Sequence, residues 1–210
     1  EGTPGQHIPG PTVEWLAGTG AKDDPYIIVN TDQLILIAQA RALWSKHFRL
    51  DADISLGGTI YPTALIQEFT GTFDGNNHTI SGLRITGDGY LGLFGQVLSG
   101  AEVYDLGVVD ADISRSGANV GILAGQNDGV VTNCYTTGVV EGDDCTGGLV
   151  GINGGSLTKC YSTSRVLGDD YVGGLVGSNN STLAYSYSTG VVSGRDDYVG
   201  GLVGANSGSV

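Results

Sequence analysis

The chain has 210 residues, a formal net charge of −13, 37 glycines and a hydrophobic share of 40%. This apolar share is enough to bury a core, and the acidic balance excludes nucleic acid as a partner because phosphate binding needs clustered Lys and Arg. No apolar run approaches the ~20 residues of a membrane-spanning helix. The chain lacks methionine, so we expect a processed protein or a piece of a longer one. The acidic composition, rich in Gly, Thr, Ser and Asn, is typical of secreted or surface-displayed bacterial proteins.

The N-terminal third predicts a strap followed by a cap. Residues 1–20 hold three prolines and five glycines and are expected to form a linker or strap. Residues 21–68 predict an N-terminal cap made of a short strand, a helix and a further strand. The helix is expected to begin at Asn30 or Thr31, which can cap its N-terminus, and to present Leu34 and Ile37 on an apolar stripe.

Residues 69–210 are dominated by a short repeated phrase. GGLVG occurs at 147–151, 173–177 and 200–204, and the related GILAG occurs at 121–125, so the closing glycines recur at an almost even interval (151 − 125 = 26, 177 − 151 = 26, 204 − 177 = 27). A period of this size indicates a solenoid, whereas a propeller blade needs ~40–45 residues. The fold class is therefore predicted to be all-β: a right-handed parallel β-helix (β-solenoid) with coils of about 26 residues and a short N-terminal capping helix.

In such a solenoid, equivalent residues of successive coils lie on top of one another. The cysteines are expected to be small apolar fillers stacked in the core, and a disulfide somewhere among Cys134, Cys145 and Cys160 is the alternative left open. The expected columns are Leu123, Leu149, Leu175 and Leu202; Asn127, Asn153, Asn179 and Asn206; Tyr135, Tyr161 and Tyr187; and Cys134 with Cys160.

Pairs of aspartates recur in register just before the GGLVG phrases. Two interpretations stay open: a solvated corner that tolerates like charges, or a column of Ca²⁺ sites, since hard cations take carboxylate and carbonyl oxygens. No cofactor is otherwise required. The pairs are Asp143 with Asp144, Asp169 with Asp170, and Asp196 with Asp197.

The stretch GGLVGINGGSLTKCYSTSRVLG, residues 147–168, resembles a GLUG repeat, and the resemblance extends over about residues 24–210. Such repeats occur in large bacterial surface proteins, in adhesins and in accessory regions of IgA-cleaving metallopeptidases. The resemblance therefore implies secretion or surface display and a binding or structural role.

Catalytic motifs are missing from the sequence: it has no HExxH, no GxSxG and no Walker loop. We therefore expect a non-catalytic extracellular structural or adhesive module. The alternative is a carbohydrate-active β-helix enzyme or its glycan-binding module, which would need acids from different coils to converge in one groove. Its candidate acids are Asp51, Asp53, Asp74, Asp105, Asp110 and Asp112.

The last repeat ends shortly after its GGLVG phrase, because Val210 aligns with Leu183 of the preceding repeat. An open coil exposes unpaired strand groups, which are a template for further β pairing. The expected partners are thus other subunits or further repeats at this coil, with glycans or other cell-surface ligands as further candidates.

Overall fold

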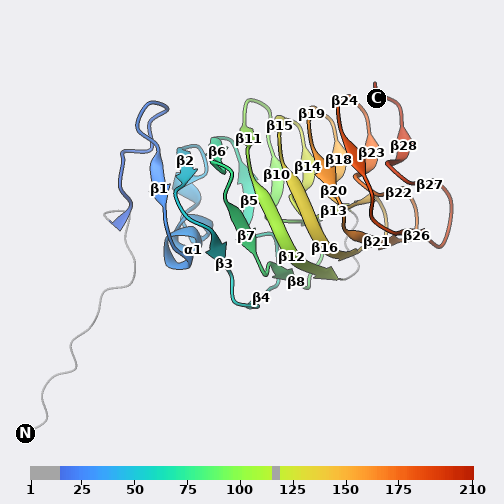
Figure 1. The fold of residues 1–210 in the computed structure, drawn as a ribbon, viewed down its shortest axis with the longest axis horizontal. Coiled ribbons are helices and arrows are strands. Elements are labelled where there is room, and N and C mark those ends of the chain that lie inside the picture. The colour runs from blue at the N-terminus through green and yellow to red at the C-terminus, as the bar shows by residue number, and fades with distance from the viewer. Residues whose placement is uncertain (1–14, 115–118) are drawn as a thin grey trace, which may run out of the picture.

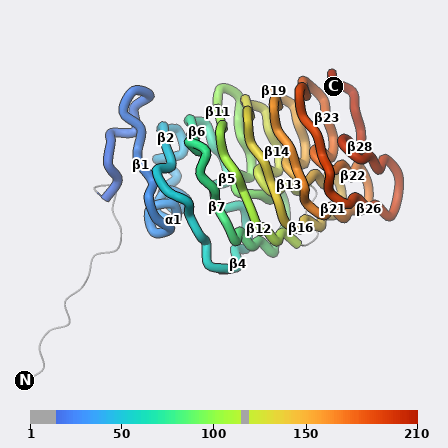
Figure 2. Tube along the Cα trace, viewed as in Figure 1, coloured from blue at the N-terminus to red at the C-terminus, as the bar shows by residue number. Residues whose placement is uncertain are grey.

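The computed structural model describes residues 15–114 and 119–210, and in it the chain is a parallel β-solenoid (Figure 1), as the repeat period predicted. The strands form four sheets that run along the coil axis, and every ladder between named strands that the described residues form is parallel. Each coil of the repeat region passes through the four sheets in turn. Figure 2 shows the coils advancing from the blue end of the molecule to the C-terminus at the opposite end.

Sheet 1 has seven strands and sheet 2 has six. Sheet 1 contains β1 (Tyr26–Ile28), β2 (His47–Leu50), β6 (Thr72–Asp74), β11 (Glu102–Tyr104), β15 (Val130–Thr132), β19 (Ser156–Thr158) and β24 (Thr182–Ala184). Sheet 2 contains β5 (Ile66–Phe69), β10 (Phe94–Val97), β14 (Ala124–Asn127), β18 (Val150–Asn153), β23 (Val176–Asn179) and β28 (Val203–Asn206).

Sheet 3 has ten strands and sheet 4 has five. Sheet 3 contains β3 (Ile54–Ser55), β4 (Ile60–Tyr61), β7 (Thr79–Ser81), β8 (Arg84–Ile85), β12 (Gly107–Ser114), β16 (Tyr135–Glu141), β20 (Tyr161–Ser162), β21 (Arg165–Gly168), β25 (Tyr187–Ser188) and β26 (Val192–Gly194). Sheet 4 contains β9 (Tyr90–Leu91), β13 (Asn119–Gly121), β17 (Thr146–Gly147), β22 (Val172–Gly173) and β27 (Val199–Gly200).

The GGLVG phrase turns a corner between sheets 4 and 2. Strand β17 ends at Gly147 and β18 begins at Val150. A Cβ atom on Gly147 would lie 2.0 Å from the carbonyl oxygen of Val150, and one on Gly148 would lie 2.3 Å from the carbonyl oxygen of Gly174 in the next coil. Only glycine leaves room for so close an approach of backbones, so these glycines set the corner.

The solenoid interior is one continuous apolar core. In the repeat region its central column is the predicted leucine column, with Leu123, Leu149 and Leu175 fully buried and Leu202 partly exposed in the last coil. The earlier coils use larger side chains instead: the rings of Phe48, Phe69, Phe73 and Phe94 are at most 1% exposed and lie 5.1–6.4 Å apart, centre to centre. Tilted aromatic pairs at this spacing add to the stabilisation from burial.

The N-terminal segment adds strands as well as a helix. Helix α1 (Thr31–Gln39) lies at the N-terminal end of the coils (Figure 1), and the Asn30 side chain caps it by accepting a hydrogen bond from the Gln33 N–H at 3.0 Å. A 3₁₀ turn, η2 (Arg41–Leu43), follows. Strand β2 pairs with β6, and β3 pairs with β7, so the sheets continue across residue 69.

Only part of the predicted linker is among the described residues. The Ile27 N–H donates to the Ala17 carbonyl at 2.9 Å, so this end of the linker segment packs on β1. The rest of that segment, residues 1–14, lies outside the described residues.

Candidate functional site

The predicted asparagine column is a buried hydrogen-bonded ladder. Asn127, Asn153 and Asn179 are fully buried at the ends of strands in sheet 2. Each Nδ2 donates to the Oδ1 of the next asparagine, at 2.8, 2.8 and 2.7 Å, and the last acceptor is Asn206. Each Nδ2 also donates to a backbone carbonyl of the following coil at 3.1–3.3 Å. Satisfied buried amides of this kind hold successive coils in one register.

The tyrosine column is a stack of parallel rings on the outside of sheet 3. The rings of Tyr135 and Tyr161 are 5.0 Å apart at 4°, and those of Tyr161 and Tyr187 are 5.1 Å apart at 2°. Burial raises the pKa of Tyr161, and its two neighbours add to the shift. A second stack, Tyr171 on Tyr198 at 5.0 Å, follows the aspartate corners and was not predicted.

The cysteines are free thiols. Cys134 and Cys160 are 1% exposed and occupy one core column, where Ser186 takes the same place one coil later and accepts a hydrogen bond from the Cys160 N–H. Burial raises the pKa of the Cys134 thiol well above its usual value. Cys145 lies at the aspartate corner with a left-handed backbone (φ 36°), and burial together with Asp144 and Asp170 raises its pKa to about 11.

The aspartate pairs lie in register at the corner between sheets 3 and 4. The Asp169 N–H donates to the Asp143 carbonyl at 2.8 Å, and the Asp196 N–H donates to the Asp169 carbonyl at 3.2 Å. The Asp169 carboxylate pairs with Arg195 at 2.9 Å, and Asp170 Oδ1 accepts the Asp197 N–H at 3.0 Å. Over the part of the chain that the structure describes, His, Cys, Asp and Glu form no group of three placed to hold a metal ion.

Several acids of the carbohydrate-enzyme alternative hold turns together. Asp74 accepts the Asn76 N–H at 2.7 Å, Asp53 accepts the Thr79 N–H at 2.8 Å, and Asp105 accepts from Asn133 Nδ2 at 2.6 Å. The hydrogen bond from Thr79 lowers the pKa of Asp53, whereas burial raises the pKa of Asp74. The Asp74 contact is an Asx turn within one coil, whereas the contacts of Asp53 and Asp105 join neighbouring coils.

One hollow over sheet 1 does bring acids of different coils together. It has a volume of about 300 Å³, and the buried Nδ1 of His47, one of its lining residues, has no hydrogen-bond partner. Asp74 on β6 and Glu102 on the neighbouring β11 both line it, and the backbone register places Glu102 beside Thr72, two residues from Asp74. Its other polar lining residues are Lys22, Asp23, Arg49, Thr72 and Tyr104.

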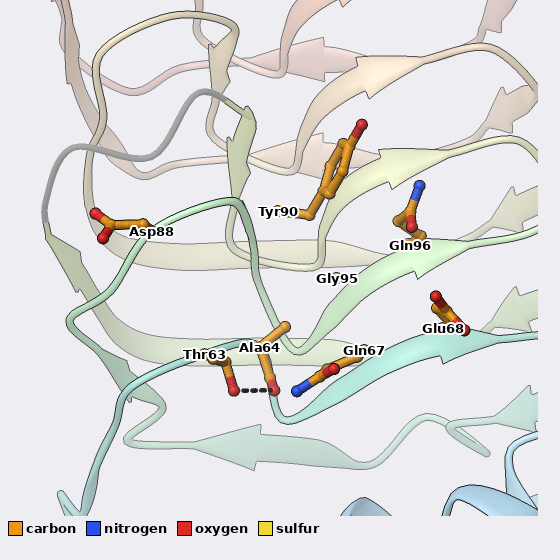
Figure 3. Close-up of a pocket in the computed structure, with 8 residues that line it drawn as sticks. All are labelled: Thr63, Ala64, Gln67, Glu68, Asp88, Tyr90, Gly95 and Gln96. Atoms are coloured by element: carbon orange, nitrogen blue, oxygen red, sulfur yellow. Dashed lines mark hydrogen bonds between the residues drawn. The ribbon is translucent and has the colours of Figure 1, made fainter.

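A second hollow lies on the outside of sheet 2 (Figure 3) and has a volume of about 240 Å³. Its floor is small, because Gly95 and Ala64 face each other: a Cβ on Gly95 would lie 3.3 Å from that of Ala64. Tyr90 stands between Asp88 and Gln96, while Gln67 and Glu68 lie on the adjacent strand β5. The eight lining residues are Thr63, Ala64, Gln67, Glu68, Asp88, Tyr90, Gly95 and Gln96.

This hollow continues toward helix α1. A neighbouring hollow of about 170 Å³ shares Thr63, Ala64 and Gln67 with it and adds Tyr61, along with apolar side chains of α1 and of the β4–β5 connection. The two neighbouring hollows are here together called the trough; Tyr90 lines the first and Tyr61 lines the second. Burial raises the pKa of Tyr61.

Sequence reasoning missed the trough residues. They come from coils without a clean repeat, and outward-facing glutamines carry no periodic signal. The nearest signal in the sequence is LGLFG at residues 91–95, which resembles GGLVG and lies directly beside Tyr90. Strand β9 ends at Leu91 and β10 begins at Phe94, so this segment also turns a corner.

The repeated coil itself has known counterparts. Residues 142–167, which contain Asn153 and Cys160, match the family model described as the GLUG motif. The chain carries a GLUG motif. This agrees with the resemblance seen in the sequence and places the motif on one coil, from the end of β16 through β21.

Longer similarities reach beyond the GLUG coil. Halomucin of Haloquadratum walsbyi (strain DSM 16790 / HBSQ001) is 33% identical over 145 residues, which cover 63% of this chain and 2% of Halomucin. The crystal structure of a putative immunoglobulin A1 protease from Bacteroides ovatus at 1.30 Å resolution has the same fold, with a TM-score of 0.67 and 23% identity. That match covers 91% of this chain and 64% of the solved chain. The chain thus spans less than two thirds of either relative.

Proposed function

We propose that the chain is a non-catalytic structural and adhesive module of a larger protein displayed outside the cell. The observation that carries the proposal is the set of columns that run from coil to coil: the side chains that repeat most regularly bind the neighbouring coil. The GLUG motif supports the proposal. Halomucin supports it too, because the matched region is only 2% of that protein, as expected for one module of a larger protein. Within residues 15–114 and 119–210, no helix has the length and apolar character needed to cross a bilayer.

The last coil supports the structural part of the proposal, because it presents the same surface that earlier coils use for stacking. A Cβ on Gly148 or Gly174 would meet a carbonyl of the next coil at 2.3 or 2.2 Å, whereas one on the equivalent Gly201 would meet nothing within 4 Å. Tyr187 and Val199 are 53% and 46% exposed on this coil. A further repeat or another subunit with GLUG chemistry fits this face.

Appending a coil tests the structural role. A copy of residues 184–210 placed after Val210 should raise the Tm, because each coil of a solenoid gains stability mainly from its neighbours. The matched control is the same copy with prolines at the positions equivalent to Ser207 and Ser209, whose N–H groups donate back to the preceding coil and which proline would leave without a donor. Equal Tm values for the two extended chains would contradict the proposed coil-on-coil role.

Surface labelling tests the location. Antibodies raised against the 210-residue chain should label intact cells of the source organism as strongly as permeabilised ones. Labelling that requires permeabilisation would refute display outside the cell.

A carbohydrate-active enzyme is the second candidate, and the hollow over sheet 1 is the observation that favours it. Two acids on neighbouring coils, one with a pKa raised by burial, are the elements that glycoside hydrolysis needs. Release of reducing ends from polysaccharides, lost in both Asp74→Asn and Glu102→Gln, would establish this activity. If the unsubstituted chain releases none, the module is non-catalytic toward those substrates.

A further inference from the structure

We propose that the trough on sheet 2 binds a short segment of a neutral oligosaccharide. The inference rests on the adhesive part of the proposed function and gives it a site and a ligand class. It is carried by three properties of the trough: aromatic rings at its two ends, amide and hydroxyl groups between them, and a charge that disfavours acidic ligands.

The two tyrosines supply surfaces for sugar rings. Tyr90 is 40% exposed although it stands on strand β9 beside a buried Leu91. Tyr61 is partly buried at the other end, next to the apolar side chains of α1. A pyranose ring has one face of C–H groups, which pack on an aromatic face, while the tyrosine hydroxyl stays available to polar neighbours.

Between the tyrosines, the lining is suited to hydroxyl groups. Gln67 and Gln96 each offer an amide donor and an acceptor, and the Thr63 hydroxyl makes only a long hydrogen bond, 3.3 Å, to the carbonyl of Ala64. Gln96 Nε2 contacts Gln126 Oε1 at 3.5 Å, the long limit of a hydrogen bond, so a sugar hydroxyl can compete for it. A sugar hydroxyl donates and accepts at once and therefore matches such a mixed set.

The charge of the trough selects against acidic sugars. Among the described residues, the ionisable side chains of its lining other than tyrosine are the carboxylates of Glu68, which pairs with the nearby Arg41, and of Asp88. The chain as a whole carries a net charge of −13, so uronates, sulfates and phosphates are repelled at long range.

The size sets the length of the bound segment. The two hollows, about 240 and 170 Å³, are individually smaller than the ~300–1,000 Å³ typical of enclosed ligand sites. An open depression of this size holds a few sugar units of a longer chain, which suits attachment to a polysaccharide surface.

Titration calorimetry with defined oligosaccharides tests the proposal. The probes are cellohexaose, xylohexaose and mannohexaose, with hexagalacturonate as the acidic counterpart. We expect at least one neutral probe to bind, and Tyr90→Ala to weaken it about tenfold, the loss of one well-packed ring contact. Gln96→Ala should also weaken binding, and hexagalacturonate should not bind.

The matched control is Tyr198→Ala, which removes a tyrosine that is 59% exposed outside the trough and should leave affinity unchanged. Circular dichroism of each variant separates lost binding from lost folding. If no neutral probe binds, or if folded Tyr90→Ala binds as tightly as the parent chain, the proposal is wrong. That failure leaves surface display untouched, because cell labelling measures it separately.

Discussion

Replacing Asn153 by alanine should destabilise the fold strongly, because this side chain lies in the middle of the buried asparagine ladder. It is fully buried, donates to Asn179 Oδ1 at 2.8 Å and to the Thr182 carbonyl at 3.1 Å, and accepts from Asn127 Nδ2 at 2.8 Å. Losing three hydrogen bonds at ~1 kcal/mol each, and leaving the neighbouring amides with fewer partners, gives a loss of about 4 kcal/mol. For a chain of this size, that corresponds to a decrease in Tm of roughly 8–16 °C.

Urea denaturation and calorimetry would measure this loss, with Asn206→Ala as the matched control. Asn206 is the exposed end of the same ladder; it accepts one hydrogen bond from Asn179 and donates a long one, 3.3 Å, to the Gly208 carbonyl, so its loss should cost about 1–2 kcal/mol. Asn153→Leu keeps the branched side-chain shape without the hydrogen bonds and should be nearly as unstable as Asn153→Ala. The reasoning is refuted if Asn153→Ala costs no more than Asn206→Ala, or if Asn153→Leu restores the parent stability.

Three further predictions concern the corners of the coils. Gly174→Ala should unfold at a clearly lower temperature than Gly201→Ala, by about 2 kcal/mol of stability or more, because only the former places a Cβ 2.2 Å from a carbonyl oxygen; equal Tm values would contradict the packing argument. Cys145 should react slowly with iodoacetamide at pH 8, because a pKa of about 11 leaves little thiolate, and Asp144→Asn should accelerate the reaction by lowering that pKa; an unchanged rate would show that the Asp144 charge has no influence. Calcium at the aspartate corners is a proposal with a direct test: ions bound only by the folded chain raise the Tm, so identical melting curves in calcium and EDTA would identify the corners as merely solvated.

The main columns of the repeat region could be predicted from the sequence. Its strands pair at nearly constant offsets: Asn127 aligns with Asn153, Asn153 with Asn179, and Asn179 with Asn206, so the sequence numbers differ by 26, 26 and 27. When successive coils contain almost the same number of residues, residues that are one repeat apart in the sequence occupy the same place in neighbouring coils. Equal spacing in the sequence therefore becomes physical contact.

The trough and the N-terminal coils were decided only by the tertiary structure. Glu68 aligns with Gln96 and Gln96 with Gln126, although the two offsets differ (96 − 68 = 28, 126 − 96 = 30), while Ile60 aligns with Arg84 at a shorter offset (84 − 60 = 24). Where coil length varies in this way, spacing no longer tells which residues share a column. Tyr90, Gln96 and Gln67 line one hollow although the turns between their strands contain different numbers of residues, and only the pairing of the strands in the folded chain fixes which of these residues become neighbours.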